Sequence, residues 1–112
     1  MSEAYHLITS IDEAEELSNR LISSKNPTAV DTETTGVNPR KESAVRRGRI
    51  LLVSIFNPKV DVLPFVIDKS GVDGLAKFIS SDLPKIYANT KFDQNIFANH
   101  RIVTRGIFWD VI

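Results

Sequence analysis

Two acidic residues, Asp31 and Glu33, stand one residue apart in the segment TAVDTETTGVNP (28–39). They follow a short apolar run, which is typical of a buried strand. Alternate residues of a strand project from one face, so the two carboxylates would lie close together. Close carboxylates repel each other, and a divalent cation removes this conflict. Their hard oxygen atoms suit Mg²⁺ or Mn²⁺; the alternative is a strand end with two solvated acids.

A second candidate pair, Asn89 and Asp93, follows the short apolar stretch 85–88 in the segment KIYANTKFDQNIF. Asn89 is a suitable N-cap for the helix expected to begin there, and Asp93 would lie in its first turn. In one interpretation Asn89 only caps the helix, and Asp93 is a solvated acid in its first turn. In the other, Asp93 approaches Asp31 and Glu33 from the neighbouring helix and completes a metal site.

The elements that must position these residues alternate between strand and helix patterns. The expected strands cover 4–9, 29–34, 50–56, 60–67 and 85–88, and the expected helices cover 11–24, 72–81 and 90–100. Pro64 favours an edge position for the strand 60–67, because proline cannot donate to a strand ladder. The order of the elements predicts an α/β fold with a mixed sheet flanked by helices.

The composition indicates one globular domain over residues 1–112. Hydrophobic residues make up 42% of the chain, enough for a core, and the 14 basic and 14 acidic residues cancel, so no global basic field indicates nucleic acid. The absence of cysteine excludes disulfides and a Cys-ligated zinc site. No run approaches transmembrane length, and the acidic, polar start is unlike a signal peptide. We therefore expect a cytoplasmic protein without a membrane partner.

A basic loop, RKESAVRRGR (40–49), comes soon after the first acidic pair. Its five basic residues either form a solvated loop or contact the phosphates of a single nucleic-acid strand.

The two acidic segments together resemble motifs of a known enzyme family. VDTETTGV (30–37) resembles the first motif, and NTKFDQNIF (89–97) the second, of the proofreading 3′–5′ exonuclease domain of family A DNA polymerases, in the DEDD superfamily. The segments 4–21 and 101–112 are also similar to the flanks of these motifs. The resemblance implies a ribonuclease H-like fold and hydrolysis of phosphodiesters at a DNA 3′ end with two Mg²⁺ or Mn²⁺ ions.

The resemblance also implies roles for individual residues. Asp31 would be shared by both metals, Glu33 would hold the metal that orients the attacking water, and Asp93 would hold the second metal through water. Substrate contacts would come from Asn89, Thr34 and Val37, which would meet the terminal nucleotide of a single strand.

The family pattern requires a fourth carboxylate, from a third motif of the form Tyr-x-x-x-Asp or His-x-x-x-x-Asp, and the sequence lacks both. Asp110 is the only acid after Asp93, and it aligns with a different position of the family. We therefore expect a C-terminally incomplete domain, inactive alone, whose missing motif comes from the rest of a polymerase or from a partner chain. The alternatives are a non-catalytic module that docks on nucleic acid or a polymerase, and an RNA-trimming DEDD exonuclease. The source would be a bacterial or phage-infected cell, or an organelle.

Overall fold

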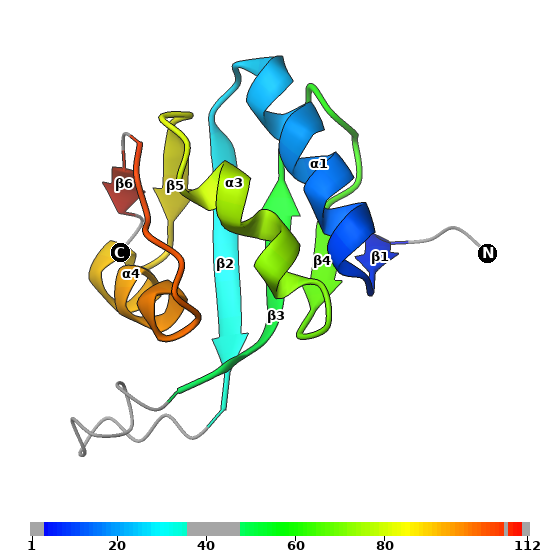
Figure 1. The fold of residues 1–112 in the computed structure, drawn as a ribbon. Helices are drawn as coiled ribbons and strands as arrows, with labels where there is room; N and C mark the ends of the chain where they lie inside the picture. The colour runs from blue at the N-terminus through cyan, green and yellow to red at the C-terminus, as the bar shows by residue number, and fades with distance from the viewer. Residues whose placement is uncertain (1–3, 36–47, 107, 111–112) are drawn as a thin grey trace.

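The computed structural model describes residues 4–35, 48–106 and 108–110. A six-stranded mixed sheet has the strand order β1-β4-β3-β2-β5-β6 (Figure 1). The strands are β1 (His6–Ile8), β2 (Thr28–Thr34), β3 (Ile50–Phe56), β4 (Phe65–Asp68), β5 (Lys85–Tyr87) and β6 (Phe108–Asp110). β3 is antiparallel to both β2 and β4, whereas the pairs β1–β4, β2–β5 and β5–β6 are parallel. The predicted α/β class with a mixed sheet is therefore confirmed.

Helix α1 (Ile11–Ser24) is the longest helix, and local sequence sets both of its ends. The Glu13 backbone N–H donates to Ser10 Oγ at 3.2 Å, and the Ser10 hydroxyl donates to the Glu13 carboxylate at 3.0 Å. The first bond satisfies one of the backbone N–H groups at the helix N-terminus that lack intrahelical partners, and the second fixes the Ser10 side chain. Lys25 ends the helix in the left-handed conformation, with φ of 54°. The predicted bounds, 11–24, are confirmed.

Helix α1 packs against the η1 turn (Val72–Leu75), which leads into helix α3 (Ala76–Ile79). A Cβ atom on Gly74 would lie 2.4 Å from the Ile11 carbonyl oxygen and 2.7 Å from Ala14 Cβ. Ser18 Oγ donates to the Gly74 carbonyl at 2.9 Å, which satisfies a buried polar pair. A glycine is therefore required at this helix crossing.

Helices α1 and α3 lie over one face of the sheet (Figure 1). The strand side chains beneath them form the core, and Val53, Ile55 and Ile67 are fully buried there. The opposite face carries large apolar side chains that are exposed, including Leu7 at 57%, Phe56 at 41% and Trp109 at 61%. The described residues thus cover one face of the sheet with helices and leave apolar surface on the other.

One sequence-based expectation about the strands is wrong, and one strand was not predicted. β4 lies between β1 and β3 rather than at an edge, because Pro64 precedes the strand and accepts a hydrogen bond from the His6 N–H at 2.9 Å through its carbonyl. The prediction had also not included β6, which forms by pairing with β5.

Within the described segments, no helix has the length and hydropathy that crossing a membrane requires.

Candidate active site

Asp31 and Glu33 lie in the second half of β2, and both side chains are exposed. In the register with β3, Asp31 faces Ser54 and Glu33 faces Leu52. The two acids share one face of the strand, as their spacing predicts. A register shift follows directly, between Glu33 and Thr34, and ends the regular pairing beside the acidic pair.

Asp93 lies in the first turn of helix α4 (Thr90–Asn99) and is only 3% exposed. Its Oδ1 accepts a hydrogen bond from the Thr32 hydroxyl at 2.8 Å, and its Oδ2 accepts one from the Asn89 N–H at 3.4 Å. The interpretation of Asp93 as a solvated acid is therefore wrong. Buried carboxylates need such donors, because an unsatisfied buried charge is costly.

Asn89 is the N-cap of α4, as predicted. Its side-chain oxygen accepts a hydrogen bond from the Phe92 N–H at 3.2 Å. Because its backbone N–H also donates to Asp93, Asn89 sets both the start of the helix and the position of the carboxylate.

The structure does not bring the three acids together as one group. Neighbouring strand residues alternate, so Asp31 and Glu33 project from the face of β2 opposite to Thr32, on whose side Asp93 lies. Across residues 4–35, 48–106 and 108–110, no three His, Cys, Asp or Glu side chains form a group that could hold a metal ion. The expected convergence is not seen in those residues, and Asp93 instead accepts hydrogen bonds from Thr32 and Asn89. That these acids are metal ligands stays a prediction.

Tyr87 and Thr32 join this site, although sequence reasoning missed both. Tyr87 pairs with Val30 across β5 and β2, and it is fully buried. Burial raises the pKa of the Tyr87 phenol, and the nearby negative charge of Asp93 raises it further. The available signal was strand alternation: a Thr between two acids projects to the opposite face, toward the core layer.

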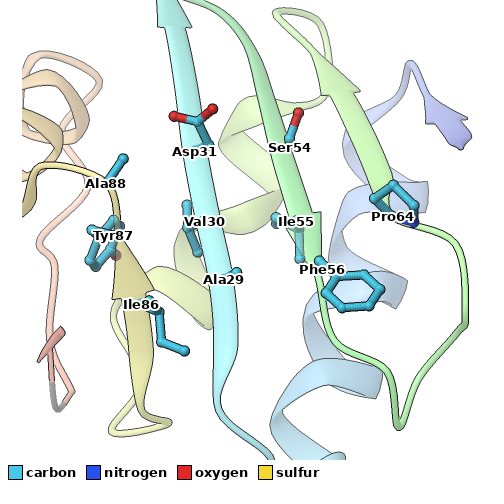
Figure 2. A pocket seen from close by; sticks show the side chains of 10 residues that line it. All are labelled: Ala29, Val30, Asp31, Ser54, Ile55, Phe56, Pro64, Ile86, Tyr87 and Ala88. Atoms are coloured by element: carbon cyan, nitrogen blue, oxygen red, sulfur yellow. The ribbon is translucent and has the colours of Figure 1, made fainter. Parts of the chain in front are cut away.

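A pocket of about 320 Å³ opens on the face of the sheet away from α1 and α3 (Figure 2). Ala29, Phe56 and Ile86 line its apolar part, and Asp31 and Ser54 lie at one end of it. The pocket therefore places an apolar surface directly beside one of the two exposed acids.

The remaining predicted contacts are only partly described. Thr34 is partly buried and pairs with Ile50 on β3. Val37 lies outside the described residues, as does most of the basic loop. Arg49, at the end of that loop, donates from its guanidinium to the Asn99 carbonyl of α4. Arg49 therefore links the end of the loop to α4, and its side chain is exposed.

Comparison with known proteins adds family and fold information. A family model described as 3′–5′ exonuclease matches residues 5–112. No curated protein sequence matches the chain.

Several solved structures share the fold. RNase D of Trypanosoma brucei in complex with RNA U12 aligns with a TM-score of 0.74 at 17% identity, over 95% of this chain and 37% of that one. The catalytic core of RRP6 from Trypanosoma brucei has a TM-score of 0.70 at 14% identity, over 98% and 32%. The exonuclease domain of EXD2, soaked in Mg and GMP, has a TM-score of 0.66 at 14% identity, over 96% of this chain and 56% of that one. The chain thus spans between about a third and just over half of these three structures, and the ribonuclease H-like fold is confirmed.

Proposed function

Because this chain belongs to the 3′–5′ exonuclease family, we propose that it carries three of the four acids of a DEDD-type nuclease site, which hydrolyses phosphodiesters at the 3′ end of a DNA strand. One observation carries the proposal. Two exposed carboxylates share a face near the end of β2, and a third acid on α4 bonds to the residue between them. This arrangement joins the two sequence motifs, 61 residues apart, at one strand.

Asp31 and Glu33 would hold divalent cations from the open face of the sheet. The donor set fits Mg²⁺ or Mn²⁺, because both exposed groups are carboxylates and hard cations prefer oxygen ligands. When bound, such cations activate a water molecule and stabilise the leaving oxygen. The family resemblance gives Asp93 a contact with the second cation through water; in this structure the Thr32 hydroxyl holds its carboxylate.

The neighbouring residues would position the substrate. Asn89 fixes Asp93 through its N–H, and we propose that its side chain also lies near the terminal nucleotide. Thr34, at the register shift after Glu33, offers backbone groups to the sugar and base. The apolar pocket beside Asp31 has room for further contacts.

RNA is the second candidate substrate. The structural likeness to RNase D and RRP6 favours it, and the RNase D structure contains RNA U12. Likeness at 14–17% identity establishes only the fold, and the motif resemblance to polymerase proofreading domains favours DNA. The sugar-specific contacts of the two substrates differ at the 2′-hydroxyl.

We also propose that the fourth acid comes from another polypeptide segment, either the remainder of a polymerase or a partner chain. The sequence offers no Tyr-x-x-x-Asp motif for it. The exposed apolar side chains Leu7, Phe56 and Trp109 are surface that such a segment would cover. A cytoplasmic location stays a prediction.

The proposal is tested by digestion of end-labelled single strands of DNA and RNA with Mg²⁺ or Mn²⁺. The protein should be a longer polypeptide in which this chain continues into a Tyr-x-x-x-Asp motif. Stepwise shortening from the 3′ end, lost in Asp31→Ala, is expected. If Asp31→Ala shortens the strands as fast as the wild type, the assignment of Asp31 is wrong. If the wild type leaves the strands unaltered, the proposed activity is wrong.

A further inference from the structure

The C-terminal end of α4 is bound to the start of β3 through three hydrogen bonds. Asn99 Nδ2 donates to the Gly48 carbonyl at 3.0 Å, and the Arg49 guanidinium donates to the Asn99 carbonyl. The Ile50 backbone N–H donates to His100 Nε2 at 2.9 Å. His100 is the C-cap residue of α4, and its ring accepts a main-chain hydrogen bond.

The segment that His100 holds is also bonded to β2, just beyond the acidic pair. The Thr35 N–H donates to the Arg49 carbonyl at 2.9 Å, and the Arg49 N–H donates to Thr35 Oγ1 at 3.3 Å. Ile50 itself is the register partner of Thr34. One hydrogen bond thus connects His100 to the backbone that follows Glu33.

Helix α4 is consequently held to the β2–β3 pair at both ends. At its N-terminal end Asp93 accepts from Thr32, and at its C-terminal end His100 accepts from Ile50. A change at either end would move Asp93 relative to Asp31 and Glu33, because a helix moves as a rigid element.

The bond to Ile50 requires one protonation state of His100. A ring nitrogen that accepts an N–H must carry a lone pair, so the imidazole is neutral, with its proton on Nδ1. Burial lowers the pKa of His100, the positive charge of Arg49 lowers it further, and Asp73 of η1 opposes both effects. A second proton would place an N–H against the Ile50 N–H and a positive charge near Arg49.

We propose that neutral His100 is a positioning residue for the acidic site, and that its protonation releases the C-terminal end of α4 from β3. This inference rests on the proposed nuclease function for its consequence, which is loss of activity under mildly acidic conditions. The release itself is a property of the fold and can be measured without substrate.

The experiment follows the Ile50 amide by ¹H–¹⁵N NMR between about pH 8 and about pH 5, the range in which histidine titrates. His100→Gln is the main variant, since a Gln side-chain oxygen can accept the Ile50 N–H but does not titrate. His6→Gln is the matched control, because it removes the chain's other histidine, on β1, which lies 3.1 Å from Asp61.

The Ile50 amide of the wild type should shift with a midpoint below 6.5, the ordinary value for histidine, and coincide with the His100 ring titration. Its protection from hydrogen exchange, corrected for the intrinsic rate, should fall about tenfold over that step, as loss of one hydrogen bond predicts. His6→Gln should behave as the wild type, and His100→Gln should show neither change.

The inference would be overturned if the chemical shift of the Ile50 amide did not follow the His100 titration. It would also be overturned if that shift changed equally with pH in His100→Gln. In the longer, active polypeptide, His100→Gln should also retain activity at a pH where the wild type loses it. If the longer polypeptide instead leaves the strands unaltered, the proposed function fails, while the NMR result on His100 still stands on its own.

Discussion

The hydroxyl of Thr32 donates a 2.8 Å hydrogen bond to Oδ1 of Asp93, which joins the residue between the two exposed acids to the third acid, on α4. Because the bond crosses from a strand to a helix, it sets how far Asp93 lies from β2. It also supplies a donor to a buried carboxylate, so it contributes to both stability and geometry.

Thr32→Val should lower the free energy of unfolding by about 1.5–3 kcal/mol, the usual contribution of a hydrogen bond to a charged group. Val keeps the β-branched shape but removes the hydroxyl. Urea unfolding measures the change. The control is the same substitution in an Asp93→Ala background, where the partner is absent and the loss should shrink. An equal loss in both backgrounds would show that the bond adds no stability.

Asn89→Ala should cost about 1 kcal/mol of stability, because it removes the N-cap of α4. Ser10→Ala removes the equivalent cap from α1, far from the acids in the fold, and should cost a similar amount. The two variants should differ in metal response. Because the Asn89 side chain caps the first turn of α4, which carries Asp93, only Asn89→Ala should reduce the increase in melting temperature that Mn²⁺ produces. Equal metal responses would contradict a role for Asn89 in the site.

The metal response itself is a separate prediction. Mg²⁺ or Mn²⁺ that binds the folded state should raise the melting temperature as its concentration rises, by mass action. Asp31→Ala should abolish most of this increase, since Asp31 is the proposed shared ligand. Asp12→Ala, in the first turn of α1, is the matched control for the loss of one acid. If Asp12→Ala and Asp31→Ala respond equally, the cation binds without a specific site.

Local sequence determined the part of the fold that was predicted. The bounds of α1 follow from Ser10 and the spacing of its apolar residues, and β3 was predicted over its observed residues because its run is β-branched and aromatic. β6 has three residues and depends on pairing with β5, more than twenty residues earlier in the chain. No local pattern distinguishes such a strand from a loop, so it was missed.

The difference between local sequence and distant partners also decides which features of the candidate site could be predicted. The shared face of Asp31 and Glu33 follows from strand alternation alone, and it was predicted correctly. The burial of Asp93 depends on a partner 61 residues away, Thr32. The role of His100 depends on Ile50, 50 residues away, so neither residue's partner could be identified from the neighbouring sequence.

Lys85 gives a prediction for alkaline pH. Its side chain is fully buried, and Nζ donates to the carbonyls of Ser81, Leu83 and Arg105 at 2.7, 2.9 and 2.8 Å. Burial lowers the pKa of Lys85 from 10.5 to about 8, and Asp82 partly opposes this change. Between these two values the unfolded chain binds more protons, so the free energy of unfolding should rise with pH in this window and be lower below it.

Lys85→Met should remove that rise, while it also lowers stability near neutral pH because the carbonyls of Ser81, Leu83 and Arg105 lose their donor. Lys77→Met is the control, since the Lys77 ammonium donates to Asn19 on the surface. Urea unfolding at about pH 8 and about pH 10 measures both effects. A stability difference between wild type and Lys85→Met that is the same at both pH values would contradict the lowered pKa.

The last prediction concerns the activity of the chain alone. It should trim single-stranded DNA or RNA little or not at all, even with Mn²⁺, because the proposed site has only three acids and the sequence contains no Tyr-x-x-x-Asp motif that would supply the fourth and the water-orienting Tyr. Misplacement of a catalytic group alone can cost on the order of a hundredfold in rate. A side-by-side digestion of 5′-labelled strands by this chain and by a longer polypeptide with a Tyr-x-x-x-Asp motif measures the difference. The longer polypeptide should be faster by at least this factor and should lose its activity in Asp31→Ala. If the short chain trims equally fast, the fourth ligand lies within these 112 residues, and Asp110 is the first residue to substitute.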